Sequence, residues 1–151
     1  MPGMEVEGSG TPADPWILST PPGTSQFESH REPEADPPAL VVRVGTTELR
    51  YHLRCIEDLH EMLIARGDWV ALGNADEQKP AKPDTVEAWG RADDNPVGGW
   101  YGLKKGLRGR FGNYVPPVLE ALGLAELEHN NRNNHIRALP EPTPAGPGGT
   151  D

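Results

Sequence analysis

The sequence contains little cysteine and no long apolar run. Cys55 is the only cysteine among 151 residues, which excludes an internal disulfide and a zinc site built from several cysteines. No apolar stretch approaches the length of a membrane span. The N-terminus also lacks a basic segment followed by an apolar one, so a signal peptide is not expected. We therefore expect a cytoplasmic protein with no membrane partner.

Basic residues are also scarce, and the charge is unevenly distributed. The chain has 14 Lys and Arg against 23 Asp and Glu, a formal net charge of −9. Residues 1–38 hold one base and seven acids, whereas residues 98–139 hold six bases and three acids. The overall charge argues against indiscriminate binding to nucleic acid, but the local excess of bases leaves a specific site possible.

Glycine and proline are abundant, with 18 and 17 residues, which indicates a substantial amount of irregular chain. Residues 1–38 are predicted to be a disordered acidic tail, residues 39–139 a single domain, and residues 140–151 a second disordered tail. Trp16, Ile17 and Leu18 form an apolar island in the first tail. This island is predicted to dock, either in a groove of its own domain or on a partner protein.

Two patterns at the start of the predicted domain are clear. Residues 40–44 and 47–53 are predicted to form a β-hairpin, because apolar and polar side chains alternate in the second segment. Residues 55–66 are predicted to form a helix with acids in its first turn, Arg66 in its last turn and Gly67 at its end. A second, short helix is predicted to begin near Thr85, with Thr85 or Asp84 as its cap.

The segment 98–114 combines apolar, basic and glycine residues at helical spacing. Its apolar positions fall on one face of a helix, with lysine and arginine beside them and glycines opposite. A glycine face allows a nucleic-acid backbone or another ligand to approach closely. Alternatively, the glycines pack against another part of the protein, or they divide the segment into two short helices.

The end of the predicted domain reads as a helix followed by a hairpin. Pro116 and Pro117 begin a short helix that Gly123 ends. Residues 124–129 and 135–139 then form two short strands, and the asparagine-rich segment between them forms a turn with Arg132 at its tip.

This succession of a hairpin, helices, a basic helix and a final hairpin is similar to winged helix-turn-helix domains. The resemblance implies an α+β fold in which a β-hairpin precedes a winged-helix-like domain that ends in a hairpin wing. It also implies binding to double-stranded DNA, with a possible regulatory role. The residues that would contact DNA are Lys104, Lys105, Arg108, Arg110, Arg132 and Arg137.

The segments DPWIL, EDLHEML, ADEQKPAKP, VEAWGR, NPVGGWYGLKKGLRGRFGNY and RNNHIRAL, taken together, also resemble a small actinobacterial protein family of unknown function. That resemblance covers nearly the whole chain and implies no activity.

The alternative to DNA binding is a protein-interaction module that uses the Trp16 segment or the acidic tail. We do not expect an enzyme, a metal site or a cofactor. His129, Asn130 and His135 loosely resemble the His-Asn-His text of metal-dependent nucleases, but no carboxylate or second ligand accompanies them. Cys55 has acidic neighbours and no activating base. No phosphate-binding glycine loop of the Walker type is present.

Overall fold

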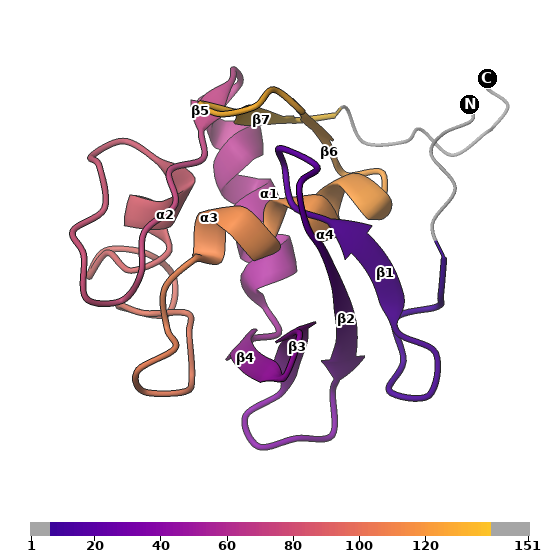
Figure 1. Cartoon of the computed structure of the whole chain (residues 1–151). Helices are drawn as coiled ribbons and strands as arrows, with labels where there is room; N and C mark the ends of the chain where they lie inside the picture. Colours follow the sequence, from indigo (N-terminus) through magenta and orange to yellow (C-terminus); the bar gives the residue numbers. More distant parts are fainter. Residues whose placement is uncertain (1–6, 140–151) are drawn as a thin grey trace, which may run out of the picture.

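Two antiparallel sheets form the frame of the protein in a computed structural model that describes residues 7–139 (Figure 1). The larger sheet contains β1 (Trp16–Ser19), β2 (Gln26–Glu32), β3 (Ala39–Val44) and β4 (Thr47–His52), each paired with the next. The smaller sheet has the strand order β5-β7-β6, with β5 (Val70–Ala71), β6 (Ala125–Leu127) and β7 (His135–Ala138).

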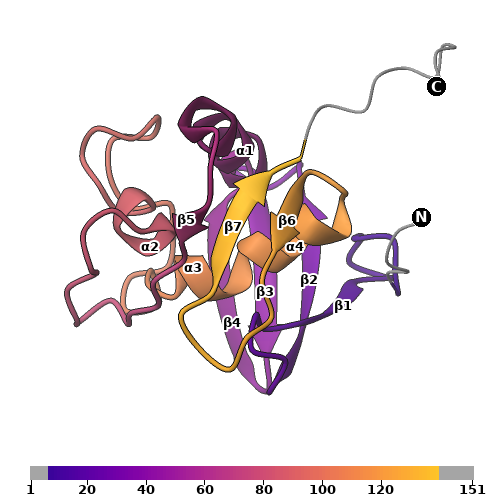
Figure 2. The ribbon, with the colours of Figure 1, turned by 90° about the horizontal axis from the view of Figure 1, so that it is seen from above.

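Four helices lie between and beside these sheets. They are α1 (Cys55–Arg66), α2 (Val86–Trp89), α3 (Phe111–Tyr114) and α4 (Pro116–Ala121). In Figure 1 the small sheet lies at the top, the large sheet lies lower, and α3 and α4 cross between them in front of α1. Seen from above, β6 and β7 lie over α4, with β2 and β3 beyond it (Figure 2). One continuous apolar core includes side chains from both sheets and from α1, α3 and α4.

The predicted hairpin and the predicted long helix are both confirmed. In the hairpin, Leu40 lies opposite Tyr51 and Val42 lies opposite Leu49, which places all four buried side chains on the inner face. Gly45 supplies the positive φ that the tight turn requires. Helix α1 begins at Cys55 and ends at Arg66, and Gly67 adopts the left-handed conformation that closes it. Thr85 caps α2 by accepting a hydrogen bond from the Ala88 amide.

The prediction that residues 1–38 are disordered is wrong for residues 16–32, which form β1 and β2. Trp16 is only 4% exposed and Leu18 8%, and both belong to the core, whereas Ile17 is half-buried. The Arg31 guanidinium lies 4.9 Å from the centre of the Trp16 ring. The segment Trp16–Leu18 was predicted to dock either in a groove of its own domain or on a partner protein. In this structure it packs on its own domain. Residues 1–6 and the predicted tail 140–151 lie outside the described part of the chain.

The prediction of a helix across residues 98–110 is also wrong, because other parts of the protein bind its backbone. The Tyr101 carbonyl accepts a hydrogen bond from the His52 amide, and the Leu103 amide donates to the Arg50 carbonyl, so this stretch extends the edge at β4. Gly98, Gly99 and Gly106 adopt positive φ. Gly102 and Gly109 pack tightly against backbone atoms. This agrees with the alternative that these glycines pack against another part of the protein.

The final hairpin is present as predicted, with β6 paired to β7. The overall class is therefore α+β. Between residues 7 and 139 no helix is long and apolar enough to cross a membrane.

Candidate nucleic-acid interface

Acidic side chains neutralise three of the six cations predicted to contact DNA. The Arg108 guanidinium donates to both carboxylate oxygens of Glu77, each at 2.9 Å. Arg110 pairs with Asp76 at 2.7 Å, and Arg137 pairs with Glu126 at 2.9 Å. An acid–base pair has little net attraction for a phosphate, so these three arginines are poor candidates for contact with DNA.

Glu77 also fixes the backbone of the loop that carries the predicted lysines. Its Oε1 atom accepts hydrogen bonds from the backbone amides of Gly106 and Arg108, both at 2.9 Å. Hydrogen bonds from the Arg108 side chain, which outweigh partial desolvation, lower the pKa of the Glu77 carboxyl from 4.5 to about 2. The loop before α2 and the loop after it are therefore joined by one carboxylate.

Trp100 adds a second connection in the same region. The guanidinium of Arg91 lies 4.4 Å from the centre of its ring, and that of Arg108 lies 4.6 Å from it. Trp100 is one of the apolar residues on one face of the predicted helix, but its half-buried ring instead lies against two arginines. Such contacts contribute roughly 0.5–1 kcal/mol each at exposed sites.

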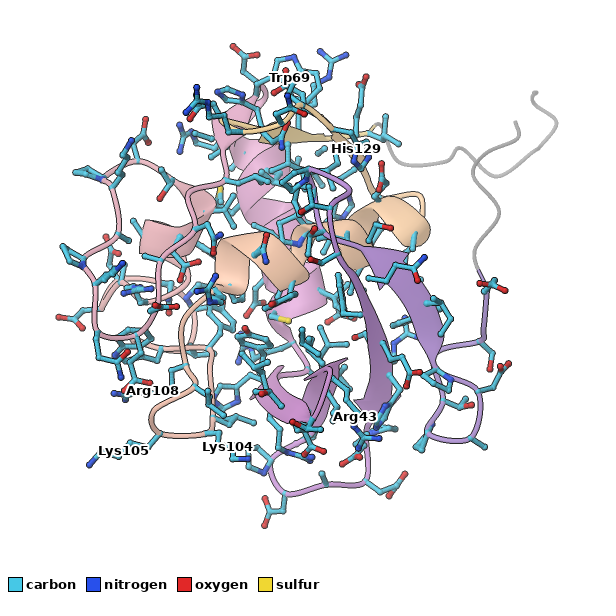
Figure 3. The ribbon with its side chains drawn as sticks, viewed as in Figure 1. Arg43, Trp69, Lys104, Lys105, Arg108 and His129 are labelled. Atoms are coloured by element: carbon cyan, nitrogen blue, oxygen red, sulfur yellow. The ribbon has the colours of Figure 1, made fainter. Side chains whose placement is uncertain are left out.

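Lys104, Lys105 and Arg132, the other three predicted cations, are exposed and form no ion pair with an acid within residues 7–139. They lie on two separate turns. Figure 3 shows Lys104 and Lys105 at the lower end of the molecule, whereas Trp69, which contacts Arg137 of the hairpin, lies at the upper end. The structure therefore does not bring the six predicted cations together into one patch.

Local hydrogen bonds shape the turn that carries Arg132. The Asn134 side chain accepts a hydrogen bond from the Asn130 amide and donates one to the Asn130 carbonyl. Asn133 adopts φ of 61°, a conformation that asparagine tolerates. The side chains at the tip of the turn are exposed, Arg132 among them.

His129 attaches this hairpin to two other elements. Its Nδ1 atom lies 2.9 Å from the Pro21 carbonyl and its Nε2 atom lies 2.6 Å from a carboxylate oxygen of Glu120 on α4. Burial lowers the pKa of His129, but the hydrogen bonds to Glu120 and Pro21 raise it by more, so the net shift is upward. The imidazolium form is the one that donates to both partners.

A cleft of about 730 Å³ lies beside the hairpin turn. Its walls come from the Pro21–Pro22 turn, the loop after β5, the start of α3 and the hairpin turn. Three cations line it, namely Lys79, Lys82 and Arg132, and none of the described lining residues is Asp or Glu. In a chain with 23 acidic residues, this local absence of acid makes the cleft distinctly basic.

The floor of the cleft is held by close backbone packing. A Cβ atom at Gly112 would lie 2.5 Å from the Leu72 carbonyl oxygen, so only glycine fits there without a shift. The Gly112 amide donates to Glu87, which is 1% exposed and also pairs with Arg91 at 2.6 Å. Arg91 in turn donates to the carbonyls of Ala75 and Lys79. The wall that carries Lys79 is therefore anchored to the core.

Sequence reasoning missed the cleft and its two lysines. Lys79 and Lys82 stand in residues 73–83, for which the sequence predicts neither a helix nor a strand, and Asn113 stands in the predicted helix. One signal was available, since the run Lys79-Pro80-Ala81-Lys82-Pro83 contains two bases and no acid. Its proximity to Arg132, about 50 positions later in the chain, depends on the tertiary fold.

The remaining residues considered for catalysis are either buried or paired with an acid of the protein. Cys55 is fully buried, and this burial raises the pKa of its thiol well above the usual range. His135 pairs at 2.8 Å with Glu128, which directly follows β6. No group of three or more His, Cys, Asp or Glu side chains able to hold a metal ion occurs within the described range 7–139.

Comparison with known proteins gives one match. A family model described as "Family of unknown function (DUF6855)" matches residues 8–139. Searches of curated proteins and of solved structures found no match. Since the matched range covers most of the chain, the protein belongs to the DUF6855 family.

Proposed function

We propose that this member of the DUF6855 family binds double-stranded DNA through cations on its protruding turns, within a winged-helix-like frame. The observation that carries the proposal is the arrangement of the chain from α1 onward. The order α1, β5, α2, α3, α4, β6 and β7 ends in a helix and a hairpin, as winged helix-turn-helix domains do, and β5 pairs with that hairpin. Arg132 stands exposed at the tip of the hairpin turn.

The contact is proposed to be with the DNA backbone. In helix-turn-helix proteins a recognition helix enters the major groove. Here α4, which occupies the corresponding place before the hairpin, is covered: Pro116 and Val118 are buried, and the helix packs on β1 and β6. Contact by Arg132, Lys104 and Lys105 would therefore provide affinity for phosphates and little direct reading of the bases.

The experiment is a fluorescence-anisotropy titration of duplex DNA with the full-length protein at low and moderate salt. Two variants, Lys104→Glu/Lys105→Glu and Arg132→Glu, remove the protruding cations. Lys79→Glu/Lys82→Glu is the matched control, because it makes the same charge change as the first variant inside the cleft. The proposal expects each of the first two variants to weaken binding at least about tenfold and the control to weaken it less.

The alternative of a protein-interaction module has one observation in its favour. Ile64 is 48% exposed, and it borders a groove of about 470 Å³ that Leu139 also lines. We place this function second because Ile64 is the one large apolar side chain found exposed in the described part of the chain, and extensive apolar patches are what usually mark interaction sites. Failure of duplex DNA to bind the wild-type protein at low salt would favour this alternative.

A further inference from the structure

We infer that the cleft beside the hairpin turn is a separate binding site for a small phosphorylated molecule rich in hydroxyl groups, such as a sugar phosphate. The site is the concave surface lined by Lys79, Lys82 and Arg132, and it does not depend on DNA binding. Arg132 is shared with the proposed DNA contact, whereas the two lysines are not. Protruding turns suit a long convex duplex, whereas small ligands bind in clefts of about 300–1,000 Å³. The cleft volume of about 730 Å³ falls within that range.

The charge of the lining selects an anion. Lys79 and Lys82 come from the loop that precedes α2, and Arg132 comes from the hairpin turn on another wall. None of these three cations forms an ion pair with an acid in the described chain, and no described lining residue is acidic. Cations that face one cleft without counter-charges repel one another, and a bound phosphate would relieve this repulsion while it accepts their hydrogen bonds.

The neutral polar groups of the lining select hydroxyls. The side-chain amides of Asn113, Asn131 and Asn133 line the cleft and make no hydrogen bond within residues 7–139. An amide offers both a donor and an acceptor, and a hydroxyl group requires both. By contrast, none of the described lining residues is Phe, Tyr or Trp. His135 is the one aromatic ring in the described lining, and Glu128 holds it at 2.8 Å, so a nucleobase would find little aromatic surface on which to stack.

The walls of the cleft are already fixed in position. Arg91 holds the Ala75 and Lys79 carbonyls, Glu87 holds the Gly112 amide, and Asn134 closes the hairpin turn. Thr85 is occupied as well, since its hydroxyl donates to the Lys82 carbonyl and accepts from the Ala88 amide. Ligand binding would then order side chains and not loops, which reduces its entropic cost.

The test is isothermal titration calorimetry of the full-length protein with glucose 6-phosphate, inorganic phosphate and glucose as separate probes. We expect glucose 6-phosphate to bind most tightly, inorganic phosphate more weakly, and glucose not measurably at about 10 mM. Lys79→Glu/Lys82→Glu should weaken glucose 6-phosphate binding at least about tenfold, and the milder pair Lys79→Gln/Lys82→Gln should weaken it to a smaller extent. Asn131→Ala should reduce the preference for glucose 6-phosphate over inorganic phosphate.

The matched control is Lys104→Glu/Lys105→Glu, which makes the same charge change outside the cleft and should retain the wild-type affinity. If neither glucose 6-phosphate nor inorganic phosphate binds at about 10 mM, the inference is overturned. An equal loss in the control and in the cleft variant would do so too, since it would show a general effect of charge. Because DNA binding is tested with the protruding cations, failure of one proposal is distinguishable from failure of the other.

Discussion

Glu77 shows how one acidic side chain determines the arrangement of two loops. Its carboxylate accepts four hydrogen bonds from residues 106–108, two from backbone amides and two from the Arg108 side chain. The same contacts that organise the Lys104–Lys105 loop therefore remove Arg108 from the set of available cations. The sequence shows which residues are charged, but it does not show which of them form ion pairs in the folded protein.

Glu77→Gln is expected to lower stability in a pH-dependent way. The folded-state pKa of Glu77, about 2, lies below the ordinary value of 4.5, so its ionised form stabilises the fold above pH 4.5. This stabilisation is lost as the pH falls from 4.5 towards 2. Urea unfolding at several pH values should show a difference between wild type and variant at pH 6 that shrinks progressively below about pH 4.5. A difference that does not change with pH would contradict the role of the charge.

Gly112→Ala tests whether the cleft floor is as tightly packed as the structure indicates. The new methyl group would lie 2.5 Å from the Leu72 carbonyl oxygen and 2.8 Å from that of Gly73, so backbone must move. Overpacking of this kind typically costs about 1–3 kcal/mol in the free energy of unfolding. Asn113→Ala, at the next position, is the control and should change stability by less than about 0.5 kcal/mol. Chemical denaturation compares the two, and equal stability of both variants would show that the floor is loose.

At the scale of elements, the sequence predicts those units whose signals are local. The strands at 39–52 follow from alternation, and α1 follows from its apolar spacing, its charged ends and Gly67. The final hairpin follows from the asparagine-rich turn between two short apolar segments. Helix α1 makes its hydrogen bonds within itself, and each hairpin pairs two strands that are neighbours in sequence.

The elements that the sequence misses depend on distant partners. Residues 98–110 have helical spacing, yet their backbone bonds to β4 and to Glu77, and glycine weakens the competing helix. β1 is short and β2 is interrupted by polar and charged residues, and they gain stability because β1 pairs with β2 and β2 pairs with β3. The same reasoning applies to the cleft, because its three cations come from loops about 50 positions apart.

Trp16→Ala measures how far β1 contributes to the fold. The ring is 4% exposed within the core, and loss of a buried tryptophan side chain typically costs about 3–5 kcal/mol in the free energy of unfolding. Thermal or urea unfolding of the full-length variant provides the measurement. Ile17→Ala, at a half-buried position on the opposite face of the same strand, is the control and should cost less. No change in stability for Trp16→Ala would mean that this segment lies outside the cooperative fold.

At the scale of the whole molecule, a net charge of −9 coexists with a few exposed cations that lack acidic partners. Asp and Glu side chains form ion pairs with Arg108, Arg110 and Arg137. No such partner is found in the described chain for Lys104, Lys105 and Arg132 on the protruding turns, or for Lys79 and Lys82 in the cleft. If the protein binds DNA as we propose, this distribution predicts weak, salt-sensitive binding, because the rest of the molecule repels the phosphates. Binding should be strongest at low ionic strength, where the few favourable contacts are least screened.

The salt dependence of duplex DNA binding measures how many phosphates the protruding cations contact. If three protruding cations each neutralise one phosphate, a plot of log K against log salt concentration should have a slope of about −2 to −3. Arg132→Glu should make this slope shallower by about one. Absence of binding at low salt, or an unchanged slope in the Arg132→Glu variant, would contradict contact between the hairpin turn and the DNA backbone.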